Sequence, residues 1–440
     1  MDRNHLASTK PLIAYSIFCG VLEYSDSILE KIKSGSKFGF ETWKIHVNPD
    51  NKSSAEIIKD FNDYYYENFV NTIFLDIDNT DSKRFNSDFA KKTARLSLAF
   101  NKEYEIKIGK RESSPVLNIK FEYLDLFFFP DGLVFYCFKC DLSTFSLDEI
   151  TLINSYLRNS GITNDMKFLY DKLSFINPST NLNTDHDSLS IGNKMKVFSI
   201  IELKDTISEE EENMLLFDLG TCSPIGSASG HNSYFQPSTK YFEELIEKNK
   251  ISVFNNWSAL ALFDTFTGLF QRGARNNFIW ENGYFNLLYL QSLYVKNHLF
   301  KVNKLFYAKG ANHQKLEDEL FEFNKYYNPS IISYNFLPTI IYEKIRYSLG
   351  INGELEKLKE GVERTNLKNK EKRDKAINNV LTIIALLTVF TVVWDLSDWI
   401  KSVFMISDTF YNILSVALTA IFLLLIFIFF YRNYRKRSKR

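Results

Sequence analysis

The sequence predicts an α/β cytosolic domain (residues 1–275), a helical region (276–352), a long stalk helix (353–375) and two C-terminal transmembrane helices. Three observations carry this prediction. Strand-like patterns bounded by turn residues fill the first part, long helical patterns dominate after Phe278, and two long uncharged runs lie near the C-terminus. The chain has 440 residues, which is too long for one ordinary domain.

The strand pattern is clearest in a hairpin. Apolar and polar residues alternate over 118–129, and the bend "PDG" follows at 130–132 before a second apolar run. "SLDE" at 146–149 has the spacing of a capping box and opens an apolar-periodic helix. We expect further strands at 196–203 and 251–254.

The helical patterns begin at Phe278, and we expect helices at 278–306, 313–327 and 337–349. The following segment contains no Pro and is rich in helix formers. Ile351, Leu355, Leu358 and Val362 keep the 4-3-4 spacing of a coiled-coil seam. These features predict one continuous helix from about 353 to 394.

Two runs are long enough to cross a bilayer, which takes about 20 apolar residues in a helix. Residues 376–394 form nineteen positions without a charge, and residues 409–431 form 23. Buried core helices are the alternative, but the second run has no polar face after Thr419. We therefore expect two spans, a short outer loop at 395–408 and a basic cytoplasmic tail at 432–440.

Flanking charge predicts the orientation of these spans. Basic residues precede the first span and follow the second, whereas the connection between them is acidic, so we expect both termini in the cytoplasm. The N-terminus resembles no signal peptide, and four Cys form no disulfide framework, as in a reducing compartment. The abundance of Phe, Asn, Lys and Ile is typical of AT-rich bacterial genes. The expected location is the bacterial inner membrane.

The first span carries a stripe of polar and small residues. Asn378, Thr382, Ala385 and Thr388 fall within roughly a third of the helix circumference. The stripe has two explanations, helix–helix packing or the lining of a water-filled pathway in an oligomer. Asp395, at the exit of the span, is either a carboxylate at a pore mouth or a solvated linker charge.

The run "GTCSPIGSASGHNS" at 220–233 is the richest in small residues. Its candidate ligand-binding residues are Gly226, Ser227, Ser229, Gly230 and His231, because such a loop lets the backbone approach a phosphate closely. It matches neither the P-loop nor the dinucleotide fingerprint. A flexible surface loop is the competing interpretation.

Other chemistry finds little support in the sequence. Cys137 and Cys140 form a CxxC, but in a strand they point to opposite faces, which favours core cysteines over a zinc site. No nucleophile elbow, kinase set or HExxH motif is present, so we expect no enzyme activity. The charge balance of 53 basic and 53 acidic residues argues against nucleic acid as a partner.

The order of elements over residues 278–440 resembles the CorA family of divalent-cation transporters. The resemblance implies a homopentamer in the lipid bilayer, whose first span lines the pore. In that family a Gly-Met-Asn motif follows the first span as the selectivity filter. This chain departs from the family there and reads "VWDLSDW" at 393–399.

CorA-like proteins without that motif are associated with type III CRISPR systems, and the enlarged cytosolic part of this chain is similar to theirs. The resemblance implies an oligomeric channel or effector, gated by its cytosolic domain and opened by a nucleotide second messenger in antiviral defence. That messenger is a conjugate of S-adenosylmethionine with AMP, or a related oligoadenylate. The alternatives are a divalent-cation transporter with an atypical filter, which carries Mg²⁺, and a membrane-anchored enzyme or binding module whose spans only tether it.

Overall fold

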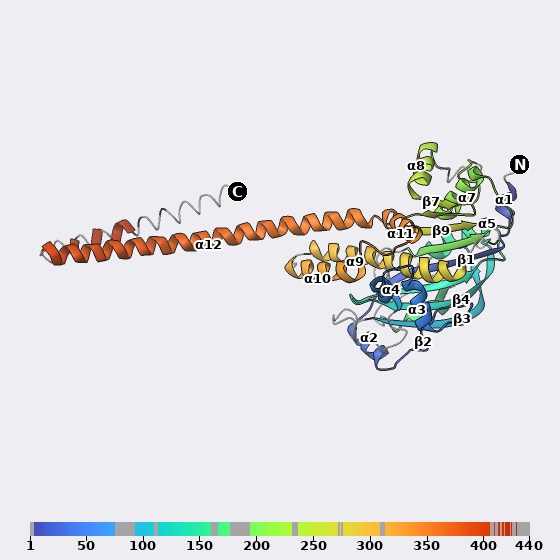
Figure 1. Ribbon diagram of the computed structural model, residues 1–440, viewed down its shortest axis with the longest axis horizontal. Helices are drawn as coiled ribbons and strands as arrows, with labels where there is room; N and C mark the ends of the chain where they lie inside the picture. The colour runs from blue at the N-terminus through green and yellow to red at the C-terminus, as the bar shows by residue number, and fades with distance from the viewer. Residues whose placement is uncertain are drawn as a thin grey trace. The chain divides into compact units, whose positions relative to one another are not determined.

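The computed structural model describes most of the chain (Figure 1). The described residues are 4–74, 93–109, 113–159, 166–176, 194–230, 236–271, 273, 276–308, 313–404 and scattered positions between 409 and 428. They divide into two compact units, Met1–Lys359 and Glu360–Arg440. The first unit contains a mixed sheet with helices, and the second contains most of a long helix.

The sheet of the first unit has nine strands in the order β2-β3-β4-β5-β1-β6-β9-β8-β7. The strands are β1 Ile13–Glu23, β2 Glu41–Thr42, β3 Ala94–Lys107, β4 Val116–Phe128, β5 Leu133–Asp141, β6 Lys196–Glu202, β7 Lys250–Phe254, β8 Trp257–Ala261 and β9 Thr265–Phe270. Only β6 and β9 pair in parallel, and every other neighbouring pair is antiparallel. The predicted α/β domain is therefore a mixed, largely antiparallel sheet, and its strands do not alternate regularly with helices.

Helices cover both faces of this sheet. They are α1 Asn4–Ser8, α2 Asp26–Lys33, α3 Ser54–Asn62, α4 Glu67–Phe74, α5 Leu147–Asn159, α6 Lys167–Leu173, α7 Glu209–Thr221, α8 Thr239–Asn249, η4 Phe278–Leu290, α9 Gln291–Phe306, α10 His313–Tyr327, α11 Phe336–Ser348 and α12 Ile351–Phe404. One hydrophobic core joins α3, α4, η4 and α9–α11 to the sheet, and a second joins α2 and α5–α8 to the opposite face. In Figure 1, α3, α4 and α9 lie in front of the strands.

The predicted hairpin is present, but β4 contains an irregularity that its sequence does not reveal. The pairing of β4 with β5 shifts between Phe121 and Tyr123. Phe121 packs in the core with α5–α8, whereas Phe127 packs in the core with η4. A bulge of this kind changes which face the following residues occupy. It breaks the simple alternation predicted for 118–129.

The predicted helix at 278–306 is two helices in one run. Phe278–Leu290 is a π-helix, and α9 continues from Gln291 without a break. π-Helices are rare, usually last a single turn and often occur at functional sites. From Trp280 to Leu290 every residue of η4 is buried, so tertiary packing maintains this geometry.

The predicted continuous helix is confirmed and is longer than expected, because α12 runs from Ile351 to Phe404. No Pro or Gly interrupts "DLSDWIKSVF", and the helix therefore continues through Asp395 instead of ending at Trp394. The helix is long and apolar enough to cross a membrane, and its most apolar stretch is not buried. Within the second unit, the rings of Phe390 and Phe422 lie 4.3 Å apart. Most of the predicted second span and the basic tail lie outside the described residues.

Candidate functional site

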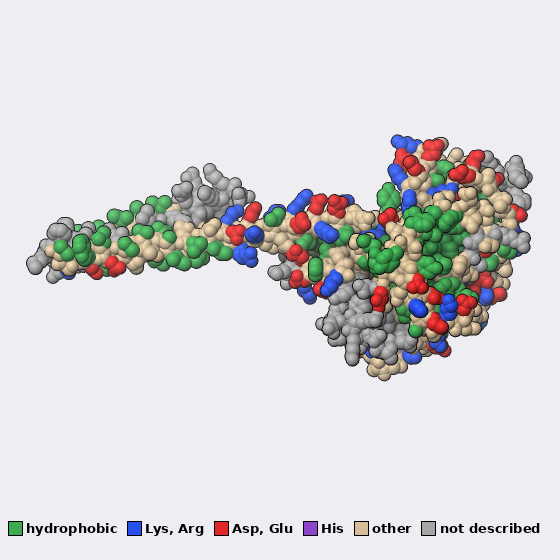
Figure 2. All heavy atoms as spheres, in the orientation of Figure 1, with side chains coloured by type: hydrophobic (Ala, Val, Ile, Leu, Met, Phe, Trp, Pro, Cys, Tyr) green, Lys and Arg blue, Asp and Glu red, His purple; other side chains and the backbone are tan. Residues whose placement is uncertain are grey.

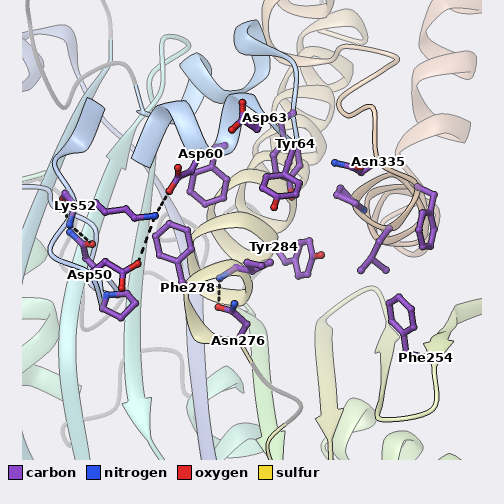
Figure 3. Close-up of a pocket in the computed structure, with 18 residues that line it drawn as sticks. Asp50, Lys52, Asp60, Asp63, Tyr64, Phe254, Asn276, Phe278, Tyr284 and Asn335 are labelled. Carbon is purple, nitrogen blue, oxygen red and sulfur yellow. Dashed lines mark hydrogen bonds and ion pairs between the residues drawn. The ribbon is translucent and has the colours of Figure 1, made fainter. Parts of the chain in front are cut away.

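A cavity of about 650 Å³ opens among four separate segments of the first unit (Figure 3). Its lining residues are Asn48, Pro49, Asp50, Lys52, Asp60, Phe61, Asp63, Tyr64, Tyr65, Phe254, Asn276, Phe278, Ile279, Tyr284, Asn335, Phe336, Leu337 and Pro338. These four segments are the loop before α3 together with the end of that helix, the start of η4, the tip of β7 and the start of α11. Binding sites for small molecules have this size and this mixture of aromatic and polar side chains.

The first wall consists of α3 and the loop before it. Ser53 accepts a hydrogen bond from the Glu56 backbone, and the Glu56 carboxylate accepts one from the Ser53 N–H group, so a capping box starts α3. The Asn48 amide bonds both backbone groups of Lys52 and closes the loop. The Lys52 ammonium thereby lies 2.7 Å from the Asp60 carboxylate and 3.7 Å from the Asp50 carboxylate. Dashed lines mark both ion pairs in Figure 3.

The opposite wall is the start of α11, and short backbone contacts tie it to the first wall. Tyr65 and Ser333 form an antiparallel bridge, and the Ser333 hydroxyl donates to the carbonyl oxygen of Tyr64. The N–H of Tyr66 donates to the carbonyl of Ile332 at 2.9 Å. At the start of the helix, the Asn335 side chain makes no capping hydrogen bond. The first N–H groups of α11 therefore lack a side-chain cap.

Aromatic rings form the interior of the cavity. Phe61 and Phe278 stack with ring centroids 5.4 Å apart, and Tyr65 and Tyr284 lie beside them as buried phenols. Neither of these two phenol hydroxyls hydrogen-bonds another described residue. Burial, followed by the nearby Tyr284, raises the pKa of Tyr65 well above its ordinary value, so the phenol stays neutral.

The rim of the cavity carries large apolar side chains from the turn after α3, the tip of β7 and the start of α11. Tyr64, Phe254 and Phe336 are 53 %, 47 % and 60 % exposed. Figure 2 shows hydrophobic side chains gathered on the visible face of this unit around α11. Large apolar side chains on a surface mark places where other molecules bind.

A buried polar cluster lies next to the loop that enters the cavity. Asp125 accepts hydrogen bonds from the Trp43 indole at 2.8 Å and the Ser97 hydroxyl at 2.5 Å. His46 Nε2 lies 2.9 Å from the same carboxylate, and its ring stacks on Tyr123. Burial lowers the pKa of His46, but Asp125 outweighs that effect and leaves the pKa raised.

This cluster contains Ser, His and Asp but does not have the geometry of a catalytic triad. A triad histidine uses one ring nitrogen for the carboxylate and the other for the hydroxyl. Here His46 Nε2 faces both groups, and the Ser97 hydroxyl donates its proton to Asp125. The arrangement therefore does not activate Ser97 as a nucleophile, and it positions the loop that leads to Asn48.

A buried ion pair holds η4 against the sheet. The Glu281 carboxylate accepts hydrogen bonds from Lys139 at 2.8 Å and from the Tyr123 hydroxyl at 2.9 Å, and its side chain is 2 % exposed. Burial lowers the pKa of Lys139, but Glu281 and Glu122 outweigh it and leave that pKa raised. Glu281 is the single charged residue in the apolar run 278–290. A lone carboxylate in such a run indicates from the sequence that a cationic partner is needed once the helix is buried.

The last turn of α11 is connected to the start of α12. Arg346 on α11 donates to Asn328 at 2.6 Å and to Asn352, in the first turn of α12, at 2.9 Å. Lys296 on α9 pairs with Glu354. Ile351 and Leu358 are buried in the core that contains η4. The first turns of α12 are thereby fixed to the same elements that form the cavity.

Backbone N–H groups and hydroxyls of the loop at 220–230 donate hydrogen bonds to acceptors of the protein itself. The Asp218 carboxylate accepts the N–H groups of Gly226 at 2.8 Å and Ala228 at 2.9 Å, and Asp148 accepts that of Ile225. The hydroxyls of Ser227 and Ser229 donate to backbone carbonyls of the same loop. The protein's own carboxylates thus occupy the positions where a bound phosphate would receive these amides.

His231 lies outside the described residues. Gly230, the last described residue of the loop, has a positive φ of 82° and packs against Gln236. That the loop binds a ligand stays a prediction.

The predicted stripe on α12 is exposed within this one chain. The hydroxyls of Thr382 and Thr388 donate to the carbonyls of Asn378 and Ile384, four residues earlier. These side chains satisfy their hydrogen bonds within the helix, so they need no partner helix. Asn378, Ala385 and Asp395 are exposed. Asp395 lines a groove with Phe390, Trp394 and Thr419, and pore lining by these residues stays a prediction.

The cysteines occupy the faces that the strand pattern predicts. Cys137 packs in the core with η4 and Cys140 in the core on the other face. The sulfur atoms of Cys137 and Cys19 lie 3.6 Å apart as free thiols. Among the described residues, no group of three or more His, Cys, Asp or Glu side chains is arranged to hold a metal ion.

The chain matches no family model, no curated protein and no solved structure. The resemblance to CorA-like proteins therefore supplies expectations only. The cavity is not recognisable from the sequence, because its lining combines segments that lie up to about 290 positions apart.

Proposed function

We propose that this chain is an oligomeric membrane channel or pore-forming effector, and that a small ligand in the cavity controls its membrane segment. One observation carries the proposal: the start of α11 forms a wall of the cavity, and Arg346 on the same helix bonds the first turn of α12. Helix α12 is apolar enough to cross a membrane. A ligand site and a candidate membrane helix thus share one short structural connection.

The mechanism follows from differential binding. A ligand between the α3 wall and the α11 wall favours the separation of the walls that it fits best. Because α11 is bonded to α12, that preference reaches the base of the membrane helix. The ligand must bind the two states with different affinity, since equal binding shifts nothing.

The resemblance supplies the finer parts of the proposal. A second span at 409–431 returns the chain to the cytoplasmic side of a bacterial inner membrane. Several copies surround a pore, which is lined by Asn378, Thr382, Ala385, Thr388 and Asp395. The activating ligand is a nucleotide-derived second messenger in antiviral defence. Constitutive Mg²⁺ transport is the competing function.

Ion flux in proteoliposomes tests the proposal with the full chain, a panel of nucleotide messengers and varied Mg²⁺. We expect flux only with a ligand. Asn352→Ala removes the bond to Arg346, and we expect it to weaken ligand-dependent flux about tenfold while ligand binding persists. Asn369→Ala, an exposed change on the same helix, is the matched control.

Three results contradict parts of this proposal. Equal ligand-dependent flux in Asn352→Ala and Asn369→Ala excludes the connection through Arg346. Steady, Mg²⁺-selective flux without any ligand establishes the transporter function instead. Unchanged flux in both Asn378→Leu and Asp395→Asn removes these two residues from the conduction pathway.

A further inference from the structure

The cavity has an excess of negative charge. Asp50, Asp60 and Asp63 supply three carboxylates, and Lys52 supplies the single ammonium among the lining residues. Lys52 is shared between Asp60 and Asp50. One ammonium therefore compensates one carboxylate, and the lining keeps a formal charge of minus two. A positively charged group is favoured at this end of the cavity, and a phosphate there faces like charges.

The interior of the cavity favours a flat aromatic body. Phe61 and Phe278 present a stacked pair of rings. Phe254 lies across the cavity from Phe278 in Figure 3, and Phe336 also lines the cavity. Such rings provide a surface on which a planar base stacks. The volume of about 650 Å³ suits a molecule the size of a nucleoside or larger.

Two phenols give the cavity unused hydrogen-bonding capacity. Tyr65 is only 3 % exposed and lines the cavity, and its hydroxyl bonds no other described residue. Tyr284, which is 6 % exposed, also lines the cavity, and its hydroxyl bonds no other described residue. Both hydroxyls are therefore available to hydrogen-bond a polar ligand in the cavity.

We infer that the ligand of this cavity is a flat aromatic molecule that carries a cationic amine. The amine lies at the Asp50–Asp60–Asp63 end, and the aromatic ring lies against Phe61 and Phe278. Hydrogen-bond acceptors of the ligand face the uncapped start of α11 and the hydroxyl of Tyr65. The inference rests on the proposed function only for what binding does to the membrane segment.

Three probes with one aromatic body and different charge test the inference on the full chain in nanodiscs. They are 5′-amino-5′-deoxyadenosine (cationic), adenosine (neutral) and AMP (anionic), each titrated by calorimetry. We expect the amine to bind about tenfold tighter than adenosine, and AMP to bind more weakly than adenosine. Tighter binding of AMP, equal affinity of all three probes, or no binding of any overturns the inference.

Variants connect the preference to named side chains. Asp50→Asn with Asp63→Asn leaves one carboxylate beside Lys52, so the tenfold preference for the amine disappears. Asp171→Asn with Asp205→Asn changes two exposed aspartates away from the cavity and leaves the preference intact. An unchanged preference in the first double variant overturns the assignment.

The phenol is tested separately from the charge. Tyr65→Phe removes one hydroxyl and keeps the ring, and we expect about fivefold weaker binding of the amine and adenosine alike. Tyr170→Phe, a buried phenol outside the cavity, is the control and leaves binding unchanged. Equal binding in Tyr65→Phe and Tyr170→Phe contradicts the role of Tyr65.

Flux measured with the same probes separates this inference from the proposed function. If the amine binds as expected but never changes flux, the ligand class is right and the proposed control of the membrane segment is wrong. If AMP binds best and opens the pore, the proposed function stands and the ligand class is wrong.

Discussion

The buried pair between Glu281 and Lys139 makes a quantitative prediction about stability. Glu281→Gln removes one buried charge and keeps the size of the side chain. The Tyr123 hydroxyl still has an oxygen to donate to, and Lys139 still has Glu122 at 3.0 Å. Removing one partner of a buried ion pair costs 3–5 kcal/mol, and these two remaining contacts bring the expected loss to about 2 kcal/mol.

Thermal unfolding of the full chain in detergent, followed by tryptophan fluorescence, measures this loss. The first unit ends at Lys359 and has an unfolding entropy near 0.75 kcal/mol/K at about 2.1 cal/mol/K per residue. A loss of about 2 kcal/mol then lowers Tm by roughly 3 °C. Glu244→Gln is the matched control, because its pair with Lys248 at 3.0 Å is exposed and such pairs contribute little.

Two results decide the matter. A decrease in Tm for Glu281→Gln no larger than that for Glu244→Gln refutes the argument that the buried pair holds η4 in place. Adding Lys139→Met to Glu281→Gln removes the largely buried ammonium that has lost one of its two carboxylate partners, and we expect it to recover part of the loss. A further large decrease in the double variant contradicts that explanation.

Two further predictions concern the core and the 220–230 loop. Burial, partly offset by backbone N–H groups, raises the pKa of Asp218 to about 7. The stability that protonated Asp218 contributes is therefore present below about pH 4 and is lost as pH rises through 7. We expect Tm to decline across this range, and an identical decline in Asp218→Asn contradicts the prediction. A Cβ at Gly20 overlaps the buried ring of Tyr136, so Gly20→Ala lowers the free energy of unfolding by about 1–3 kcal/mol. A Cβ at Gly353, within a helix, meets no neighbour within 4 Å, so Gly353→Ala raises it by about 0.5–1 kcal/mol. Equal denaturant midpoints for the two variants contradict the packing argument.

Elements set by neighbouring residues were predicted well from the sequence. Ser146 and Glu149 form the expected capping reciprocity at the start of α5, with the Ser146 N–H group donating to Glu149 at 2.8 Å. Phe129 and Leu133 bond across the predicted bend. The absence of Pro between 353 and 394 predicts the long helix, because nothing in that stretch interrupts its hydrogen bonds.

Features that depend on distant residues were not predicted. The bulge in β4 follows from its partner strand, and the π-helix depends on burial along its whole length. The pair of Lys139 and Glu281 joins residues 142 positions apart. The cavity has the same origin, since Asp60, Tyr284 and Asn335 meet only after the sheet and both helical layers have formed. Hydrophobic periodicity describes one helix or strand at a time and contains no information about contacts between residues that are distant in the sequence.

The two edges of the sheet restrict how this chain joins others. One edge is β2, only two residues long with both exposed, and the other is β7, whose pairing shifts between Ile251 and Phe254. Short or irregular edge strands offer little template for an added strand. Association by strand addition is therefore disfavoured at both edges, and the proposed oligomer would have to form through helices and loops. The exposed apolar side chains around α11 then become the natural place to introduce cysteine pairs for cross-linking between copies.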